Sequence, residues 1–238
     1  MVAMEQIFRD QKFKDFRDRD SSALFSDIEF RYCRFETCHV SMTFEPAKRS
    51  TLRRIKLIHC EQVNCNIWPA ILEDVTVDGL DTGRLLIANA CAYRHVVLRG
   101  NVGNIKICRW VPWISGPAGY LVRRQEAMDR ANAEYYKGVD WALDISQAEF
   151  ISGEVEGIPL GLVRRDPATQ FVLRATAIKE GRWRGVQEAR KDWHALLDAY
   201  DKKGTGDVIL IAPKAAPDFK PLLAGLMALR AAGVAEPD

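Results

Sequence analysis

The sequence lacks long hydrophobic runs and a strong charge of either sign. No apolar stretch approaches the eighteen residues that a membrane span requires, and the first twelve residues have neither the apolar core nor the cleavage site of a secretion signal. We therefore expect a cytoplasmic protein that does not act at a membrane. Its 238 residues, 47% of them hydrophobic, are enough for one large domain or two modest ones.

The charge balance argues against a dedicated nucleic-acid-binding protein. The formal net charge is +2 for the whole chain, +3 over residues 1–117 and −1 over residues 118–238. Binding duplex DNA requires a basic patch, and imitating DNA requires a strongly acidic face. Neither half of the chain has such a bias, so we expect no DNA binding and no DNA mimicry.

Motifs of catalysis and metal binding are also missing. The chain has no Gly-x-Ser-x-Gly elbow, no phosphate-binding glycine loop and no His-Glu-x-x-His zinc site. The paired cysteines are separated by four residues without a nearby histidine pair, which fits zinc poorly. We assign no catalytic residue, no cofactor and no metal. We expect all six cysteines to be small buried core residues: Cys33, Cys38, Cys60, Cys65, Cys91 and Cys108.

A five-residue period is the clearest pattern that is present. Phe25, Phe30, Phe35 and Val40 are five residues apart, and a small or apolar residue precedes each of them by two positions. A spacing of two places both side chains on one face of an extended chain. Because five is odd, a straight strand would turn its buried face outward in alternate repeats. The chain is therefore expected to change direction once per repeat.

These residues resemble the pentapeptide-repeat family. The resemblance implies a square, right-handed β-solenoid in which each five-residue unit forms one side. It is close only over residues 22–44. After Phe44 the period lapses over residues 45–51, which we interpret as an inserted loop, and it then returns with spacings of ten and twenty residues.

The twenty-residue spacing predicts parallel strands. Alignment at twenty places Cys65, Leu85 and Ile105 in one column, as successive coils of a parallel β-helix would. Strands stacked in this way lie roughly 4.8 Å apart. Two alternatives stay open: a parallel β-helix with another cross-section, and an antiparallel meander with a hairpin turn at Asp78–Gly79.

Two changes of pattern predict three segments. The repeat ends in the proline- and glycine-rich stretch 112–119. We predict an N-terminal cap over residues 1–21, a β-solenoid over residues 22–116 and a small α+β domain over residues 117–238. The cap is expected to be a short amphipathic helix that uses Phe8, Phe13 and Phe16.

The second half of the chain loses the five-residue period. Apolar spacing predicts helices over residues 120–137 and 186–202, and a final helix that begins near residue 219 and ends before Gly233. Strands are expected at 141–145, 161–164, 171–174 and 207–213. Within the last of these, residues 208–212 are all apolar, which predicts burial on both faces. The segment Asp166–Thr169 is typical of a type I turn.

Two functions from different classes are compatible with these features. The first is a non-catalytic protein-interaction or regulatory scaffold, in which the α+β domain recognises a protein partner or mediates self-association. The second is an enzyme, either a β-helical carbohydrate-active protein or one with an unrecognised site in the C-terminal domain. We favour the scaffold. Its candidate partner-binding residues are aromatic or basic: Trp110, Trp113, Arg164, Arg165, Arg182, Trp183 and Arg184. For Trp110 and Trp113, we favour an end cap over the last coil to a binding role, which stays open as the alternative. For the arginines, we favour an ordinary exposed loop and turn, and binding stays open as the alternative.

Overall fold

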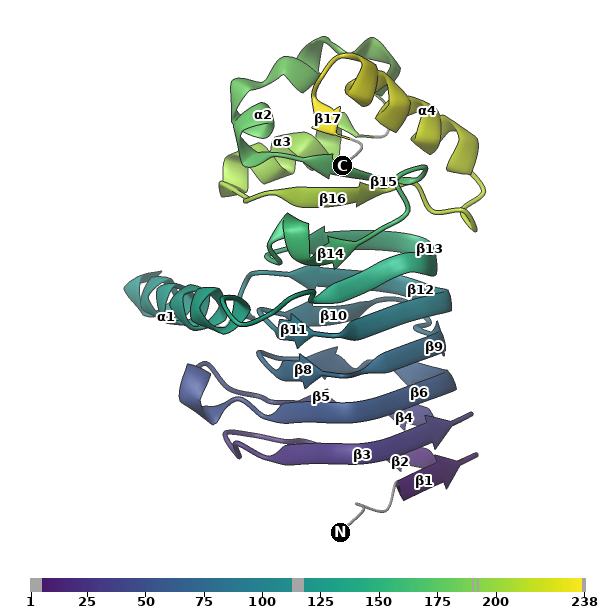
Figure 1. Ribbon diagram of the computed structural model, residues 1–238, viewed down its shortest axis with the longest axis vertical. Coiled ribbons are helices and arrows are strands. Elements are labelled where there is room, and N and C mark those ends of the chain that lie inside the picture. The colour runs from purple at the N-terminus through teal and green to yellow at the C-terminus, as the bar shows by residue number, and fades with distance from the viewer. Residues whose placement is uncertain (1–5, 113–117, 190, 192, 237–238) are drawn as a thin grey trace.

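The strands of this protein lie one above another along an elongated molecule. The computed structural model describes residues 6–112, 118–189, 191 and 193–236. Figure 1 shows the stacked strands along the long axis, with the helices α2 (Ala175–Glu180), α3 (His194–Lys203) and α4 (Phe219–Ala231) gathered at the end opposite the N-terminus. Among the described residues, no helix has the length and apolar character needed to cross a membrane.

The first fourteen strands make up the parallel region, in which each pairing of one strand with another is parallel. Its strands are β1 (Gln6–Arg9), β2 (Lys12–Lys14), β3 (Leu24–Arg31), β4 (Arg34–Glu36), β5 (His39–Val40), β6 (Thr51–Val63), β7 (Asn66–Ile67), β8 (Ile71–Glu73), β9 (Thr76–Asp81), β10 (Leu86–Asn89), β11 (Ala92–Arg94), β12 (Val96–Cys108), β13 (Leu143–Glu156) and β14 (Val163–Arg164).

The pairings that β6, β7, β8 and β9 make with the following repeat have the predicted spacing, with partners twenty or twenty-one residues apart. Lys56 in β6 pairs with Thr76 in β9, twenty residues later, and Thr76 pairs with Val97 in β12. Parallel pairing at this distance is incompatible with a meander, in which neighbouring strands run in opposite directions. The antiparallel alternative is therefore wrong for this region.

Left-handed residues recur where the five-residue period predicts a change of direction. Tyr32 follows β3 with φ 53°, and Thr37 follows β4 with φ 54°. The same spacing returns at Arg54, His59 and Asn64, whose φ angles lie between 49° and 56°. Non-glycine residues seldom adopt this conformation, so its repetition marks regular bends in the backbone.

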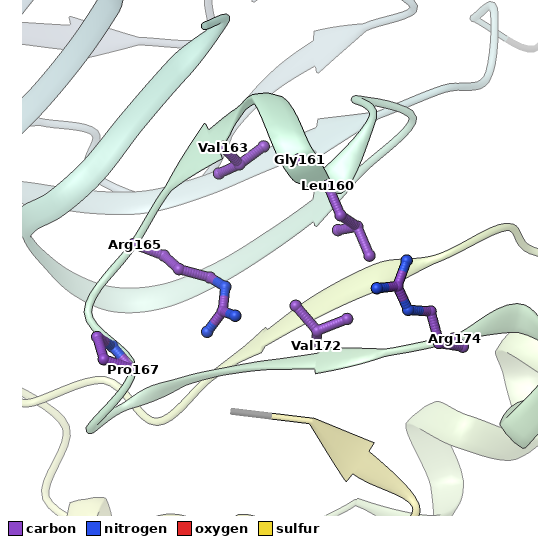
Figure 2. Close-up of a pocket in the computed structure, with 7 residues that line it drawn as sticks. All are labelled: Leu160, Gly161, Val163, Arg165, Pro167, Val172 and Arg174. Atoms are coloured by element: carbon purple, nitrogen blue, oxygen red, sulfur yellow. The ribbon is translucent and has the colours of Figure 1, made fainter. Parts of the chain in front are cut away.

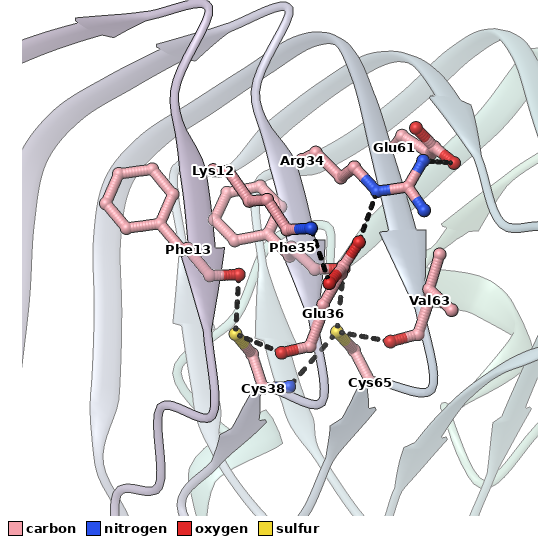
Figure 3. A network of polar contacts seen from close by, with 9 residues as sticks. All are labelled: Lys12, Phe13, Arg34, Phe35, Glu36, Cys38, Glu61, Val63 and Cys65. Atoms are coloured by element: carbon pink, nitrogen blue, oxygen red, sulfur yellow. Dashed lines mark hydrogen bonds and ion pairs between the residues drawn. The ribbon is translucent and has the colours of Figure 1, made fainter.

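Outward side chains of neighbouring strands form ion pairs. Figure 3 shows Glu36 of β4 accepting hydrogen bonds from Lys12 of β2 at 2.8 Å and from Arg34 at 2.7 Å. Arg34 also pairs with Glu61 of β6. Charges from three successive repeats therefore neutralise one another on this face.

Inward cysteines satisfy backbone carbonyl groups. The Cys38 thiol donates to the carbonyl oxygens of Phe13 at 3.6 Å and Glu36 at 3.4 Å, as Figure 3 shows. All six cysteines are buried with free thiols, in the core positions that the sequence favoured. Burial raises the pKa of the Cys91 thiol to about 12 and that of Cys108 to about 11. These thiols are therefore protonated hydrogen-bond donors at neutral pH.

The predicted column through Leu85 is shifted by one residue. Ile87 pairs with Asn66, and Leu86 pairs with Ile105. Leu85 itself is 41% exposed, whereas Leu86 is buried. The reason is a turn at Gly83–Arg84, which lengthens this repeat and moves the inward positions one residue along the chain.

The predicted N-terminal helix is absent from residues 6–20, because the strand pattern begins earlier than expected. β1 and β2 occupy this segment and pair with β3 and β4. Phe8 stacks on Phe30 with ring centroids 5.4 Å apart, and Phe13 stacks on Phe35 at 5.3 Å. Phe8 and Phe13 are five residues apart, so they belong to the repeat rather than to a helical stripe.

Two insertions project to the same side of the parallel region (Figure 1). The first contains the short helix η1 (Pro46–Lys48), where the loop was predicted, and the second is the helix α1 (Ala118–Tyr136). Arg49 donates to Asn132 Oδ1 of α1 at 2.6 Å, and the Arg124 guanidinium lies 4.3 Å from the ring centroid of Phe44. The insertions therefore pack against each other as well as against the strands.

Parallel pairing continues beyond residue 116, where the sequence predicted a domain boundary. β12 pairs with β13 from Val96↔Leu143 to Ile107↔Val155, so α1 is inserted between two paired strands. β14 then pairs with β13 through Leu143↔Val163, again twenty residues apart.

The C-terminal region, residues 165–236, consists of antiparallel strands and the helices packed on them. β13 and β15 pair antiparallel to β16, and β17 pairs antiparallel to β15, so the whole sheet is mixed. The remaining elements are η2 (Leu160–Leu162), β15 (Gln170–Leu173), α2 (Ala175–Glu180), η3 (Arg182–Gly185), η4 (Gln187–Ala189), α3 (His194–Lys203), β16 (Val208–Ile211), α4 (Phe219–Ala231) and β17 (Ala235–Glu236).

β16 is buried on both faces, as its wholly apolar sequence predicted. Ile209 and Ile211 pack into the core of the parallel region, whereas Val208 and Leu210 pack into the core beneath the helices. The side chains of β15 also enter both cores: Val172 packs into the parallel core, and Phe171 and Leu173 pack beneath the helices. These two strands therefore join the two cores.

Candidate binding pockets where the parallel region ends

A pocket with two arginines opens between β14 and β15. We call it the arginine pocket; its volume is about 330 Å³, and it is lined by Leu160, Gly161, Val163, Arg165, Pro167, Val172 and Arg174. Figure 2 shows both arginine side chains extending into this space, with Leu160 and Val172 between them. Leu160, Val163 and Val172 all pack against the core of the parallel region. The pocket therefore combines an apolar floor with two cationic groups.

A tight turn places Arg165. The backbone N–H of Thr169 donates to the carbonyl oxygen of Asp166 at 3.1 Å, which confirms the predicted turn. Gln170, just after the turn, donates from Nε2 to the carbonyl oxygen of Ile145 at 3.0 Å and so fixes the turn to β13. Arg165 donates from Nη1 to the carbonyl oxygen of Gln170 at 2.9 Å. This hydrogen bond helps to hold the Arg165 guanidinium at the pocket.

Ion pairs place Arg174 on the opposite side of the pocket. Arg174 precedes α2 and lies 3.2 Å from Asp207 and 3.0 Å from Glu236. These carboxylates raise the pKa of the guanidinium, with Glu236 contributing most. Because both partners come from distant parts of the chain, the position of Arg174 depends on the antiparallel pairing around β15.

A second pocket, which we call the helix pocket, lies next to the first. It also has a volume of about 330 Å³, and it is lined by Arg109, Asp129, Asn132, Ala133, Tyr136, Gly157, Ile158, Pro159, Leu160, Gly206 and Asp207. Leu160 belongs to both pockets, and the Arg174–Asp207 ion pair joins a residue of one to a residue of the other. The two hollows are therefore neighbours along the junction between the parallel and C-terminal regions.

Close packing around Arg109 shapes the helix pocket. Arg109 pairs with Asp129 of α1 at 2.8 Å. Gly157 has φ 86°, and a Cβ added there would lie 2.5 Å from Cβ of Arg109, so only glycine fits. The preceding residue, Glu156, is buried, and this burial raises the pKa of its carboxyl group.

The structure distributes the predicted partner-binding residues over several places. Arg165 lies in the arginine pocket, but the neighbouring Arg164 is exposed and lies 4.1 Å from the ring centroid of Trp141. Trp110 is half-buried beneath the Arg109 guanidinium, at 4.8 Å. Trp113 is outside the described residues.

The cluster at residues 182–184 belongs to η3, next to α2 and α3. Trp183 is 2% exposed and donates from Nε1 to the carbonyl oxygen of Ile178, so it is a core residue. Arg182 pairs with Glu180, and Arg184 pairs with Asp201 while covering the Trp183 ring. None of these three residues lines either pocket.

A histidine between two carboxylates holds the segment that follows α1. His95 Nδ1 lies 3.1 Å from Asp74, and Nε2 lies 2.7 Å from Asp140. These two carboxylates, Asp140 foremost, raise the pKa of the imidazole. The ring also packs on Trp141 at 4.7 Å. Both ring nitrogens are engaged, so this cluster attaches the connection into β13 to the parallel region.

Comparison with known proteins adds no relative of this chain. No family model, no curated protein and no solved structure matches it.

Proposed function

We propose that this protein is a non-catalytic interaction scaffold built on a right-handed β-solenoid of the pentapeptide-repeat type. Parallel pairing at about twenty residues and left-handed residues at five-residue intervals support this architecture. The six buried free thiols suit a reducing compartment, and on that basis we place the protein in the cytoplasm.

The arginine pocket carries the functional proposal. Along the parallel region, charged side chains pair across neighbouring strands, as in Asp27–Arg54 at 2.5 Å and Asp78–Arg99 at 2.8 Å. Arg165 lies at the edge of an apolar floor and donates to the backbone carbonyl group of Gln170. Arginine is enriched among the residues that dominate the binding energy of protein interfaces. Recognition of a protein partner is therefore assigned to the C-terminal end, and the parallel region supports it.

An enzyme remains the alternative outcome of the test. The carboxylates of the helix pocket, Asp129 and Asp207, are each in an ion pair with an arginine. His95, the histidine with a raised pKa, lines neither pocket. These ion pairs hold neighbouring segments together and leave no carboxylate assigned to catalysis. We therefore favour binding over turnover.

Affinity capture with the immobilised full-length protein tests this proposal. The captured partner is then purified, and its binding is measured by calorimetry against wild type, Arg165→Ala and the control Arg182→Ala. We expect defined stoichiometry and about a tenfold weaker Kd for Arg165→Ala, which corresponds to about 1.4 kcal/mol. Arg182 is exposed, pairs with Glu180 and lines neither pocket, so its variant should bind normally. Equal binding by both variants, or turnover of a small-molecule panel by the protein alone, would contradict the proposal.

A further inference from the structure

The backbone edge of the parallel region is open at the N-terminal end, where Figure 1 shows β1 and β2. Among the described residues, β1 pairs only with β3 and β2 only with β4, whereas β3 also pairs with β6. An edge strand presents backbone N–H and C=O groups with which a further strand can pair. The sheet can therefore continue beyond β1 and β2.

The core of the parallel region is also open at this end. Phe8 and Phe13 pack against that core but are only half-buried. Phe16 is 45% exposed, although its carbonyl oxygen accepts from the backbone N–H of His39 and the residue thus belongs to the repeat. Covering these three rings would remove apolar surface from water, which favours association at this end.

The opposite end of the parallel core is covered. Val172 of β15 and Ile209 and Ile211 of β16 pack into the core there. The core of the described chain therefore has one open end. Two copies that meet through the same end form a closed two-fold dimer, whereas a head-to-tail contact would continue into a filament. Association through the open end is thus restricted to two copies.

The charges around the open end favour a second copy over a strongly acidic or strongly basic partner. Further along the chain, charges such as those of Asp78 and Arg99 pair across neighbouring strands. Six exposed charged residues at the open end form no ion pair with another described residue: Arg9, Asp10, Lys14, Asp15, Arg17 and Arg19. Because both signs are present, acidic residues of one copy can lie beside basic residues of the other. A partner of one sign would match only part of this set.

We propose that the open N-terminal end binds a second copy of this chain, so that two molecules form a closed end-to-end dimer. The edges of β1 and β2 gain backbone partners from the other copy, and the rings of Phe8, Phe13 and Phe16 are covered. This dimer goes beyond the proposed interaction function and does not depend on it, because the arginine pocket lies where the parallel region ends. Each dimer presents two arginine pockets, one at either end.

Analytical ultracentrifugation of the full-length protein between about 1 and 200 µM provides the test. We expect the mass to double with a Kd of the order of 10 µM. Phe16→Lys places a charge on the open end and removes a largely exposed ring, so it should weaken the dimer at least about tenfold. The matched control is Met227→Lys on α4, where the side chain is 49% exposed at the other end of the molecule, and it should dimerise like wild type. Thermal unfolding checks that both variants are folded.

Hydrogen-exchange mass spectrometry at low and high protein concentration locates the interface. Exchange in β1 and β2 should slow down in the dimer, whereas exchange in β17 should not change. A protein that stays monomeric over the whole concentration range overturns the inference and makes the charged residues a guard against strand pairing. A dimer that persists in Phe16→Lys, or that leaves exchange in β1 and β2 unchanged, uses another surface. Growth beyond two copies would contradict the closed arrangement, and protection of β1 and β2 only by a captured partner would make that partner the occupant.

Discussion

The parallel region and the C-terminal region bury their cores in different ways. The parallel core repeats small and branched residues such as Cys33, Ile55 and Val77, each packed between similar neighbours. The C-terminal core depends on large single residues such as Phe171, Trp183 and Trp193, which occur at irregular spacing. Repetition lets each repeat be stabilised by its neighbours alone, whereas the second core needs segments far apart in the chain.

The two regions meet at β15 and β16, whose side chains enter both cores. Val172 of β15 packs into the parallel core, and its neighbours Phe171 and Leu173 pack beneath the helices. Both pockets lie at this junction. The contrast therefore raises the question of whether the regions unfold together.

The largest effect is expected from Phe171→Ala. The Phe171 ring is fully buried, so its removal should leave a cavity and reduce the free energy of unfolding by about 3–5 kcal/mol. Hydrogen exchange should accelerate in β15, β16 and α4 but remain slow in β6 and β9, because the ring belongs to the C-terminal core. Chemical denaturation and hydrogen-exchange mass spectrometry provide these measurements.

The matched variant is Leu98→Ala, in the middle of the parallel core, where the side chain is 6% exposed. It should accelerate exchange in β9 and β12 first. If either variant loosens both regions equally, the two cores form one cooperative unit and the distinction between them is not energetic.

A smaller effect is expected from Glu73→Gln, which alters polar contacts instead of apolar packing. Glu73 is 6% exposed and joins three strands, since it pairs with Arg53 of β6 at 2.7 Å and with Arg94 of β11 at 3.2 Å. Tyr135 of α1 donates to the same carboxylate at 3.0 Å. An amide keeps the volume but loses the charge and one acceptor, so we expect a loss of about 2 kcal/mol in urea denaturation.

Glu134→Gln is the control for that measurement. Glu134 lies on α1 next to Tyr135, pairs with Lys137 and has a side chain that is 73% exposed. Exposed pairs contribute little, so this variant should unfold at the same urea concentration as wild type. A similar loss in both variants would mean that removing one negative charge, and not the contacts at Glu73, lowers the stability.

The same contrast explains how far the fold follows from the sequence. Parallel pairing was predictable because a period of five or twenty residues is a local pattern that needs no knowledge of distant contacts. The predicted inward position was wrong at Leu85, because the turn at Gly83–Arg84 adds one residue to this repeat. Nothing in the repeat pattern indicates that extra residue. The segment around Phe8 and Phe13 was misassigned because many charged residues surround the aromatics, which imitates a helical stripe.

The candidate site followed from the sequence only in part. Arg165 stood out because the adjacent basic residues Arg164 and Arg165 were grouped with the basic cluster at residues 182–184, and it does line a pocket. Arg174 was missed, because its place opposite Arg165 depends on contacts with Asp207 and Glu236, more than thirty residues away. The sequence shows which residues are charged, but it does not show which distant segments lie next to one another in the fold.

The smallest expected effect concerns the attachment of α1 and β13 to the parallel region through His95. Its carboxylate partners raise the pKa of the imidazole in the folded protein above the ordinary value of about 6.5. The resulting stabilisation should be fully present below that ordinary pKa and disappear as the pH rises through the folded pKa. The His95 side chain is 34% exposed and that of Asp140 is 73% exposed, so solvent screening keeps this effect below that of Glu73→Gln.

Urea denaturation of wild type and His95→Gln between pH 5.5 and 9, chosen to bracket the pKa of about 6.5, measures this contribution. The difference between the two proteins should be largest at the acidic end and shrink toward pH 9. Asp140→Asn should lower the imidazole pKa in an NMR titration, because Asp140 is the main cause of its shift. Parallel stability curves for wild type and His95→Gln would show that the connection into β13 is held by the packing of Trp141, 4.7 Å from the imidazole, and not by charge.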